Sequence, residues 1–174
     1  MKKSIMLIAA LCMTSVMTFA QKVIRVSTDK TDLVMKVSPK GRLYQVYLGD
    51  KLLNPSDYDN LKWDVYAASD GSVCQRGHEV YATSGAEDFF EPAVAATHAD
   101  GNMTTYLYYK SSEQKAVEGG TETVITLQDK VYPFTVKLHY VAYPKENVIN
   151  AWSEISHNEK SPVTLWRYSS TMLY

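Results

Sequence analysis

The stretch Tyr132-Pro-Phe-Thr-Val-Lys-Leu-His-Tyr140 decides the fold. From Phe134 onward apolar and polar residues alternate strictly, so phenylalanine, valine, leucine and tyrosine share one face. Threonine, lysine and histidine share the other face, because successive side chains of a strand point to opposite sides. The stretch therefore predicts a strand with one buried face and one face in water, the pattern typical of antiparallel sheets.

The same alternation recurs along the chain, and turn residues separate the runs. Further strands are predicted at residues 23–26, 32–37, 43–48, 93–97, 104–109, 122–127, 148–155 and 163–168. The last of these is expected to be a core strand because it carries Val163, Leu165 and Trp166. Many short strands joined by short turns predict an all-β antiparallel sandwich.

Residues 54–90 interrupt this pattern with weak strand signals and many Gly, Ser, Asp and Tyr residues. Long irregular segments in compact domains are usually functional loops or disordered chain. Aromatic residues such as Trp63, Tyr66 and Tyr81 argue against disorder. We therefore expect an ordered excursion over the surface of the sandwich.

The first twenty residues have the features of a secretory signal peptide. Lys2 and Lys3 precede an apolar run from Ile5 to Phe19, and the small residue Ala20 follows. The run is about 15 residues long, whereas a membrane-spanning helix needs about 20. We expect cleavage after Ala20 and export to the periplasm or the extracellular space, with an uncleaved anchor as the alternative.

Composition narrows the functions of the remaining domain, residues 21–174. The full chain has 18 Lys and Arg against 19 Asp and Glu. Loss of Lys2 and Lys3 with the signal peptide would leave a formal net charge of 16 − 19 = −3. Without a basic block or a basic amphipathic stretch, neither nucleic acid nor a membrane surface is an expected partner. Cys74 would be the one remaining cysteine, so no intrachain disulfide is expected and a packing role is preferred over a nucleophile.

Residues 21–174 carry no recognisable catalytic machinery. The four histidines lack metal-ligand spacing, and phosphate-binding loops and nucleophile elbows are absent from the sequence. No cofactor or metal is expected. Glycosidases use two carboxyl groups at a defined separation, but solvated loop residues are the preferred interpretation of the acidic residues in the excursion. These are Asp57, Asp59, Asp64, Glu79, Glu87, Asp88 and Glu91.

Aromatic residues are the other enrichment, with 13 Tyr, 3 Trp and 4 Phe. Such rings can stack on the apolar faces of sugars, and they also form sandwich cores and cross-strand pairs. For Tyr106, Tyr108 and Trp152, which lie on predicted strands, we expect core positions. For Trp63, in the excursion, a core position and a sugar-facing position are equally consistent with the sequence.

The order of motifs after residue 77 carries a family resemblance. Residues 77–81 read Gly-His-Glu-Val-Tyr, residues 85–93 read Gly-Ala-Glu-Asp-Phe-Phe-Glu-Pro-Ala, and matching stretches continue to residues 162–170. This order resembles the N-terminal domain of bacterial α-galactosidases of glycoside hydrolase family 36. Phe90 departs from the family block, which usually has Arg there, and Thr83-Ser84 lies where the block tends to have Pro.

The resemblance implies a concrete architecture and activity. Family members begin with an antiparallel β-supersandwich of the galactose-mutarotase type, followed by a (β/α)8 barrel and a small β-domain. They remove terminal α-galactosyl residues from oligosaccharides with retention, using two aspartates of the barrel. The chain would then be the early part of the supersandwich, cut from a longer polypeptide. Both aspartates would lie beyond Tyr174, so no catalytic residue is assigned to this chain.

The resemblance also implies a substrate loop. In some members a loop of the N-terminal domain lines the active site, sometimes that of a neighbouring subunit in a tetramer. Residues 54–66 are the candidate here, with Trp63 and Asp57 as the expected sugar-facing groups. The expected partners are a galactose-containing oligosaccharide, the downstream barrel and a homo-oligomer. A non-catalytic carbohydrate-binding sandwich and a structural or adhesion module stay open as alternatives.

Overall fold

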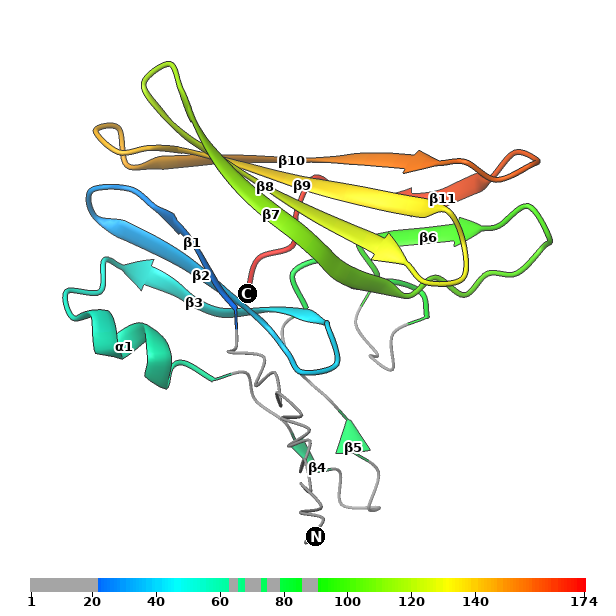
Figure 1. Ribbon diagram of the computed structural model, residues 1–174, viewed down its shortest axis with the longest axis horizontal. Helices are drawn as coiled ribbons and strands as arrows, with labels where there is room; N and C mark the ends of the chain where they lie inside the picture. The colour runs from blue at the N-terminus through cyan, green and yellow to red at the C-terminus, as the bar shows by residue number, and fades with distance from the viewer. Residues whose placement is uncertain (1–21, 63–65, 68–72, 75–78, 86–90) are drawn as a thin grey trace, which may run out of the picture.

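The computed structural model of the chain describes residues 22–62, 66–67, 73–74, 79–85 and 91–174. Within these ranges antiparallel strands predominate, and the helix content is a single short helix. A three-stranded and a four-stranded sheet face one another around a shared hydrophobic core (Figure 1). The predicted all-β sandwich is therefore confirmed.

The smaller sheet comes from the N-terminal part of the described chain. Its strands are β1 (Val23–Ser27), β2 (Thr31–Val37) and β3 (Leu43–Asp50), in the order β1-β2-β3. On β2, Leu33 and Met35 enter the core while Asp32 and Lys36 point to the other face, and all four are at most 2% exposed. Burial on both faces requires a cover, which the helix α1 (Pro55–Asn60) provides on the outer side (Figure 1).

The larger sheet is a meander in the order β10-β9-β8-β7. Its strands are β7 (Leu107–Val117), β8 (Gly120–Asp129), β9 (Phe134–Tyr143) and β10 (Val148–His157). On β9 the four apolar residues of the predicted face, Phe134 to Tyr140, are at most 1% exposed. Full burial of such a side chain stabilises a fold by about 1.5–3 kcal/mol, so this face anchors the core as predicted.

Two glycines make the tight turn between β7 and β8. Gly119 has φ +73°, in the left-handed region that favours glycine. A Cβ atom at Gly120 would lie 2.2 Å from the carbonyl oxygen of Ala142 on β9. The backbone conformation of Gly119 and the close approach of β9 at Gly120 therefore explain why glycine occupies both positions.

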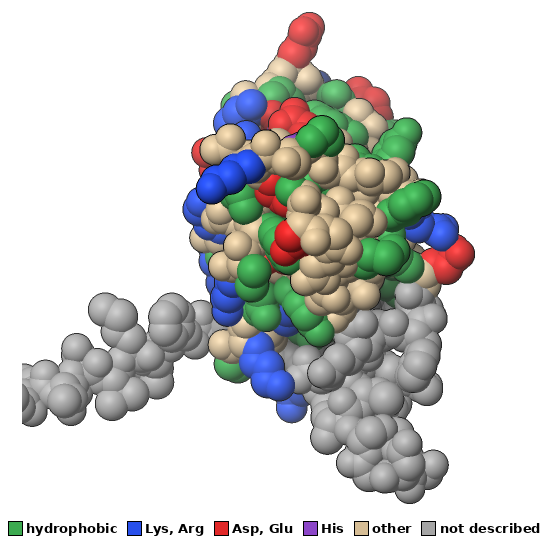
Figure 2. Space-filling view, turned by 90° about the vertical axis from the view of Figure 1, so that its right-hand side faces the viewer, with side chains coloured by type: hydrophobic (Ala, Val, Ile, Leu, Met, Phe, Trp, Pro, Cys, Tyr) green, Lys and Arg blue, Asp and Glu red, His purple; other side chains and the backbone are tan. Residues whose placement is uncertain are grey.

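A two-stranded ribbon lies at one end of the sandwich. It pairs β6 (Val94–Thr97) with β11 (Thr164–Tyr168). A strand was predicted at residues 163–168 and is found at 164–168, but the predicted core position is wrong, because all five residues are exposed and Trp166 is 67% exposed. The physical reason is that, among the described strands, β11 pairs with β6 alone, so it belongs to a two-stranded ribbon and to neither of the two larger sheets. Figure 2 views this end of the molecule, and hydrophobic side chains lie on its surface.

Three aromatic residues expected in the core lie nearer the surface. Tyr106 is 37% exposed, and Tyr108 and Trp152 are half-buried. Tyr106 precedes β7, which begins at Leu107 and not at residue 104 as predicted. Trp152 instead forms a cross-strand pair, because it lies opposite His139 on the outer face of the large sheet.

The excursion contains more regular structure than its composition indicates. Besides α1, it contributes the short strands β4 (Tyr66–Ala67) and β5 (Val73–Cys74), which pair with one another. The segment 79–85 enters the core, where Val80 and Tyr81 are 2% and 3% exposed.

The expected signal peptide, residues 1–20, lies outside the described part of the chain, so cleavage and export stay predictions. Among the residues that the structure does describe, no helix has the length and apolar character needed to cross a membrane.

Candidate functional site

The candidate substrate loop is docked on the small sheet through Tyr58. The Tyr58 hydroxyl donates to Asp32 Oδ2 at 2.6 Å, and the guanidinium carbon of Arg25 lies 4.4 Å from the ring centre. Burial and the neighbouring Asp32 carboxylate raise the pKa of Tyr58. Pro55 begins the helix at a position where its missing N–H costs nothing. One aromatic anchor thus fixes the start of the loop.

The end of the same helix is held by a buried lysine. Lys36 is 1% exposed, and its Nζ donates to the carbonyl oxygens of Asp59 at 3.0 Å and Leu61 at 2.7 Å. Burial lowers the pKa of Lys36. Carbonyl groups at a helix C-terminus lack intrahelical hydrogen-bond donors, and the Lys36 ammonium provides a donor for two of them. Lys36 of β2 therefore fixes the chain at the end of α1.

The two predicted sugar-facing residues have different outcomes. Asp57 is half-buried on α1, and one of its carboxylate oxygens accepts from Asn54 Nδ2 at 3.3 Å. Trp63 lies outside the described residues. The structure therefore does not test whether the two lie together, and their sugar-facing role stays a prediction.

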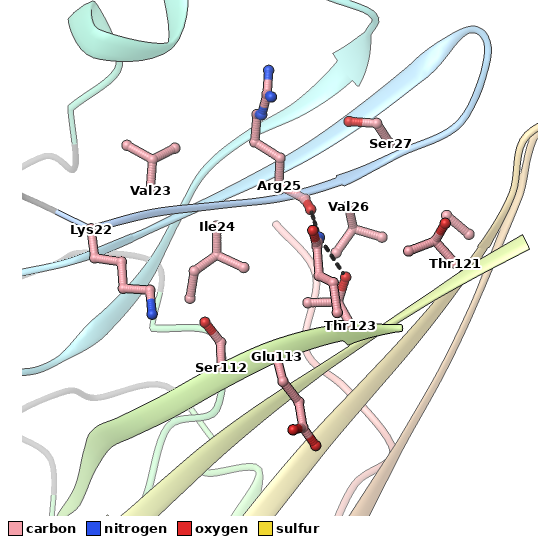
Figure 3. Close-up of a pocket in the computed structure, with 12 residues that line it drawn as sticks. Lys22, Val23, Ile24, Arg25, Val26, Ser27, Ser112, Glu113, Thr121 and Thr123 are labelled. Atoms are coloured by element: carbon pink, nitrogen blue, oxygen red, sulfur yellow. Dashed lines mark hydrogen bonds between the residues drawn. The ribbon is translucent and has the colours of Figure 1, made fainter. Parts of the chain in front are cut away.

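A groove of about 540 Å³ lies between the two sheets. One wall is β1 with Lys22, and the other is residues 112–114 of β7; Figure 3 shows Ser112 on that second wall. The floor is the end of the inner face of the large sheet, where Thr121 and Thr123 replace the apolar residues found further along β8. The groove is thus a polar opening of the sandwich interior.

His98 is the centre of a closed hydrogen-bond network. Its Nδ1 lies 2.8 Å from Glu159 Oε1, and its Nε2 lies 2.9 Å from Thr105 Oγ1. The ring stacks on Tyr132 at 3.6 Å between centroids. A carboxylate, an imidazole and a hydroxyl in line are the parts of a nucleophilic relay. However, Thr105 is 0% exposed, so a substrate has no access and the network joins three loops.

A second polar row crosses the outer face of the large sheet. Lys115 Nζ lies 2.8 Å from Glu122 Oε2, and Glu122 Oε1 lies 2.7 Å from His139 Nδ1. The His139 ring stacks on Trp152 at 4.7 Å. Hydrogen bonds from Lys115 and His139 lower the pKa of Glu122. The row pairs residues of all four strands and fixes their register.

Glu79 departs from the expected solvated loop position. Its Oε2 accepts from Arg42 Nη2 at 2.7 Å, its Oε1 accepts from Arg42 Nε, and both side chains are 10% exposed. Arg42 Nη1 also donates to the carbonyl oxygen of Leu107 at 3.0 Å. This clamp joins β3, the segment 79–85 and β7. The sequence did not predict this clamp, because no local sequence pattern indicates that two residues 37 positions apart are in contact.

Lys36 was likewise missed, although a lysine that follows the apolar run Leu33-Val34-Met35 within a predicted strand is a weak signal for a covered charge. Within the described ranges, no three His, Cys, Asp or Glu side chains lie close enough to hold a metal ion. The polar groups of the described residues therefore have three roles: they join segments of the sandwich, they hold α1 on the small sheet, and they line the groove.

These features define an antiparallel β-sandwich in which buried polar clamps join the two sheets and position a surface loop. Residues 41–174 match the glycosyl hydrolase family 36 N-terminal domain. The chain belongs to this family.

Solved α-galactosidases share the fold. The enzyme from Lactobacillus brevis has a TM-score of 0.73 at 20% identity, over 88% of this chain and 24% of that chain. The α-galactosidase AgaA from Geobacillus stearothermophilus, solved in complex with raffinose, has a TM-score of 0.74 at 22% identity, over 86% of this chain and 24% of that chain. The galactosidase domain of the α-galactosidase-sucrose kinase AgaSK has a TM-score of 0.75 at 19% identity, with 86% and 24% covered.

The chain therefore spans about a quarter of the length of these enzymes, 24% in each case. Comparison with curated proteins gave no significant match.

Proposed function

We propose that this chain is the N-terminal domain of an exported, retaining α-galactosidase that removes terminal α-galactosyl residues from oligosaccharides. The observation that carries the proposal is the match of residues 41–174 to the family 36 N-terminal domain. In this role the sandwich supports a downstream catalytic barrel and takes part in a homo-oligomer. AgaA, which shares the fold, was solved with raffinose, a galactose-containing oligosaccharide of the proposed substrate class.

Activity is tested by comparing two polypeptides on a chromogenic α-galactoside. One is the 174-residue chain, and the other is the product of the uninterrupted reading frame that contains it. We expect no hydrolysis by the first and steady turnover by the second. Turnover by the 174-residue chain alone would contradict the supporting role, whereas an inactive longer product would contradict the proposed activity.

The proposed loop contribution is tested in the active polypeptide. Because α1 is anchored by Tyr58 and Lys36, Asp57 has a fixed base from which to meet a sugar hydroxyl. We expect Asp57→Asn and Trp63→Ala to raise KM several-fold. The matched control is Asp59→Asn, an exposed carboxylate on the same helix. Unchanged KM and kcat in Trp63→Ala would remove Trp63 from the proposed loop site.

Export is tested by the mass of the secreted protein. Cleavage after Ala20 gives a mature chain that begins at Gln21. An uncleaved, membrane-bound product would contradict release and favour an anchor.

A second candidate function, a non-catalytic carbohydrate-binding sandwich, is favoured by one observation. Trp166 and Tyr168 are 67% and 72% exposed on β11, where their rings are available for stacking. Calorimetry of the 174-residue chain with raffinose discriminates the two candidates. Binding that disappears in Trp166→Ala would support the second candidate, and no binding would leave the first.

A further inference from the structure

The groove between the sheets follows the backbone edge of a strand. Lys22 and all five residues of β1 line it. Successive strand residues point to opposite faces, so a groove that touches every one of them follows the edge of the strand. In the described chain β1 pairs only with β2, which leaves its other edge turned towards the groove.

The hydrogen bonds identify the backbone groups on that edge. Lys22 O accepts from Val37 N at 3.0 Å, so residue 22 is a bonded position of the β1–β2 pair. Bonded and non-bonded positions alternate in an antiparallel pair. The odd-numbered residues therefore turn their N–H and C=O groups to the groove. These are Val23, Arg25 and Ser27.

A side-chain amide already occupies one of these positions. Gln114 Nε2, from β7, donates to Arg25 O at 2.9 Å and to Thr123 Oγ1 at 3.0 Å (Figure 3). The first of these bonds is the one that a backbone N–H of a neighbouring strand would make. The Arg25 side chain points away from β7 and lies over the Tyr58 ring, so it does not block the edge.

Within β1 itself the edge lacks the usual devices that keep an open edge unpaired, although Lys22, just before the strand, extends across one end of the groove (Figure 3) and places its Nζ 5.1 Å from the centre of the Tyr109 ring on β7. Native sheets use proline, bulges, charges that project across the edge, or a covering segment. β1 reads Val-Ile-Arg-Val-Ser, and its register with β2 has no bulge. The opposite wall, β7, is itself the last strand of the large sheet. Two strand edges therefore face one groove.

We propose that this groove receives an extended strand from the remainder of the α-galactosidase polypeptide, which pairs with the free edge of β1 and displaces the Gln114 amide. The inference rests on the proposed function. The solved relatives offer such a segment, since this chain covers 24% of their length. The inward side chains of the inserted strand are small or polar, because the floor presents Thr121, Thr123 and Ala142. Five residues of β1 give an edge of about 17 Å.

Amide hydrogen exchange tests the proposal in both polypeptides. In the monomeric 174-residue chain the amides of Val23 and Ser27 should exchange at least tenfold faster than those of Ile24 and Val26, which bond to β2. In the longer polypeptide the two groups should become equally protected. The Arg25 amide should follow Val23 and Ser27.

Each outcome decides the question. Equal protection in the monomeric chain would overturn the free edge. Protection that rises with the concentration of the 174-residue chain would assign the groove to a second copy and overturn the proposed occupant. Unprotected edge amides in a longer, active enzyme would overturn the groove proposal and leave the proposed function intact. Protected amides in a longer, inactive polypeptide would support the groove and contradict the α-galactosidase.

A variant that fills the groove provides a second measurement. Thr121 lines the groove and is exposed in this chain, so Thr121→Trp is compatible with the fold, which circular dichroism of the 174-residue chain verifies. It should restore fast exchange of Val23 and Ser27 in the longer polypeptide. Thr126→Trp, on the opposite face of β8, is the matched control and should leave their protection unchanged. Full protection in Thr121→Trp would overturn the proposal.

Discussion

Two arginine–glutamate pairs of the molecule lie in opposite surroundings. Arg42 and Glu79, at the join of β3 and β7, have side chains that are each 10% exposed. Arg167 and Glu91, on the ribbon of β6 and β11, have side chains that are 45% and 77% exposed. The same two chemical groups therefore meet once inside the molecule and once in water, and burial is what separates the two pairs.

The surroundings change what each pair can contribute. Burial opposes ionisation of Arg42, but the hydrogen bonds and charge of Glu79 outweigh it and raise the pKa of the guanidinium. Removing one partner of such a pair leaves an uncompensated buried charge. For the ribbon pair, hydrogen bonding to Arg167 lowers the pKa of Glu91, yet water replaces the partner at once if either side chain is removed. The buried pair of Arg42 and Glu79 is therefore expected to stabilise the contact between the two sheets, whereas the exposed pair is expected to contribute little.

The largest expected effect is at the buried pair. Glu79→Ala should lower the free energy of unfolding by about 3–5 kcal/mol, because Arg42 then stays buried without a counter-charge. Urea unfolding of the 174-residue chain measures the loss. The double variant Arg42→Met with Glu79→Leu should recover most of it, since apolar residues of similar volume replace both charges. A loss below about 1 kcal/mol in Glu79→Ala would end the contrast between the pairs.

The fold should lose stability at alkaline pH because Tyr140 is buried in the core. Burial raises the pKa of Tyr140 to about 12, whereas an unfolded tyrosine ionises near pH 10. Stability from the neutral buried hydroxyl is therefore complete below about pH 10 and is lost as the pH rises towards 12, by roughly 2–3 kcal/mol. Unfolding as a function of pH measures the loss, and Tyr140→Phe should reduce it. An identical alkaline profile in that variant would contradict the assignment.

A smaller effect is expected at Lys36, a buried cation that binds carbonyls and not a carboxylate. Lys36→Met removes hydrogen bonds to Asp59 and Leu61, each of which contributes about 1 kcal/mol. The loss is partly offset because a buried ammonium carries a desolvation cost, so we expect about 1 kcal/mol of destabilisation. Proteolysis should become faster near α1. The control Lys51→Met removes an exposed lysine that bonds the Thr28 carbonyl, and faster cleavage there as well would argue against a specific role for Lys36.

The smallest effect is expected at the ribbon. Glu91→Gln removes the charge that Arg167 contacts, and the unfolding midpoint in urea should stay unchanged within error, with or without high salt. A clear decrease would show that the exposed pair contributes to stability, and the comparison of the two pairs would then have to rest on something other than burial.

Much of the fold follows from local pattern. The alternation along residues 134–140 places β9 correctly and predicts which face is buried, because period two is a property of every strand. The same rule failed for the second half of β7, residues 110–117, whose side chains are mostly polar and exposed on both faces. It also misjudged β11, since an apolar strand reads the same whether it lies in a core or on an exposed edge.

The candidate site was less predictable for a related reason. The resemblance pointed to residues 54–66 as a loop, but the anchors that dock it, Asp32 and Lys36, lie more than twenty positions earlier on β2. Likewise, the groove exists only because β1 and β7 come together from distant parts of the chain. Contacts of this kind follow from topology, and a single sequence does not encode them in any local pattern.

The last residues have a consequence for the order of folding. Tyr81 donates to Ser169 O at 2.7 Å, and Gln45 Nε2 donates to Tyr174 O at 2.5 Å, so residues 169–174 lie between the sheets (Figure 1). Each sheet is a set of consecutive hairpins that can form from neighbouring residues, whereas these two contacts span 88 and 129 positions. Loop closure must precede such contacts. During synthesis the hairpins of the two sheets can therefore form first, and the contacts of residues 169 and 174 are added later than those that already join the sheets, such as the bond from Arg42 to Leu107 O.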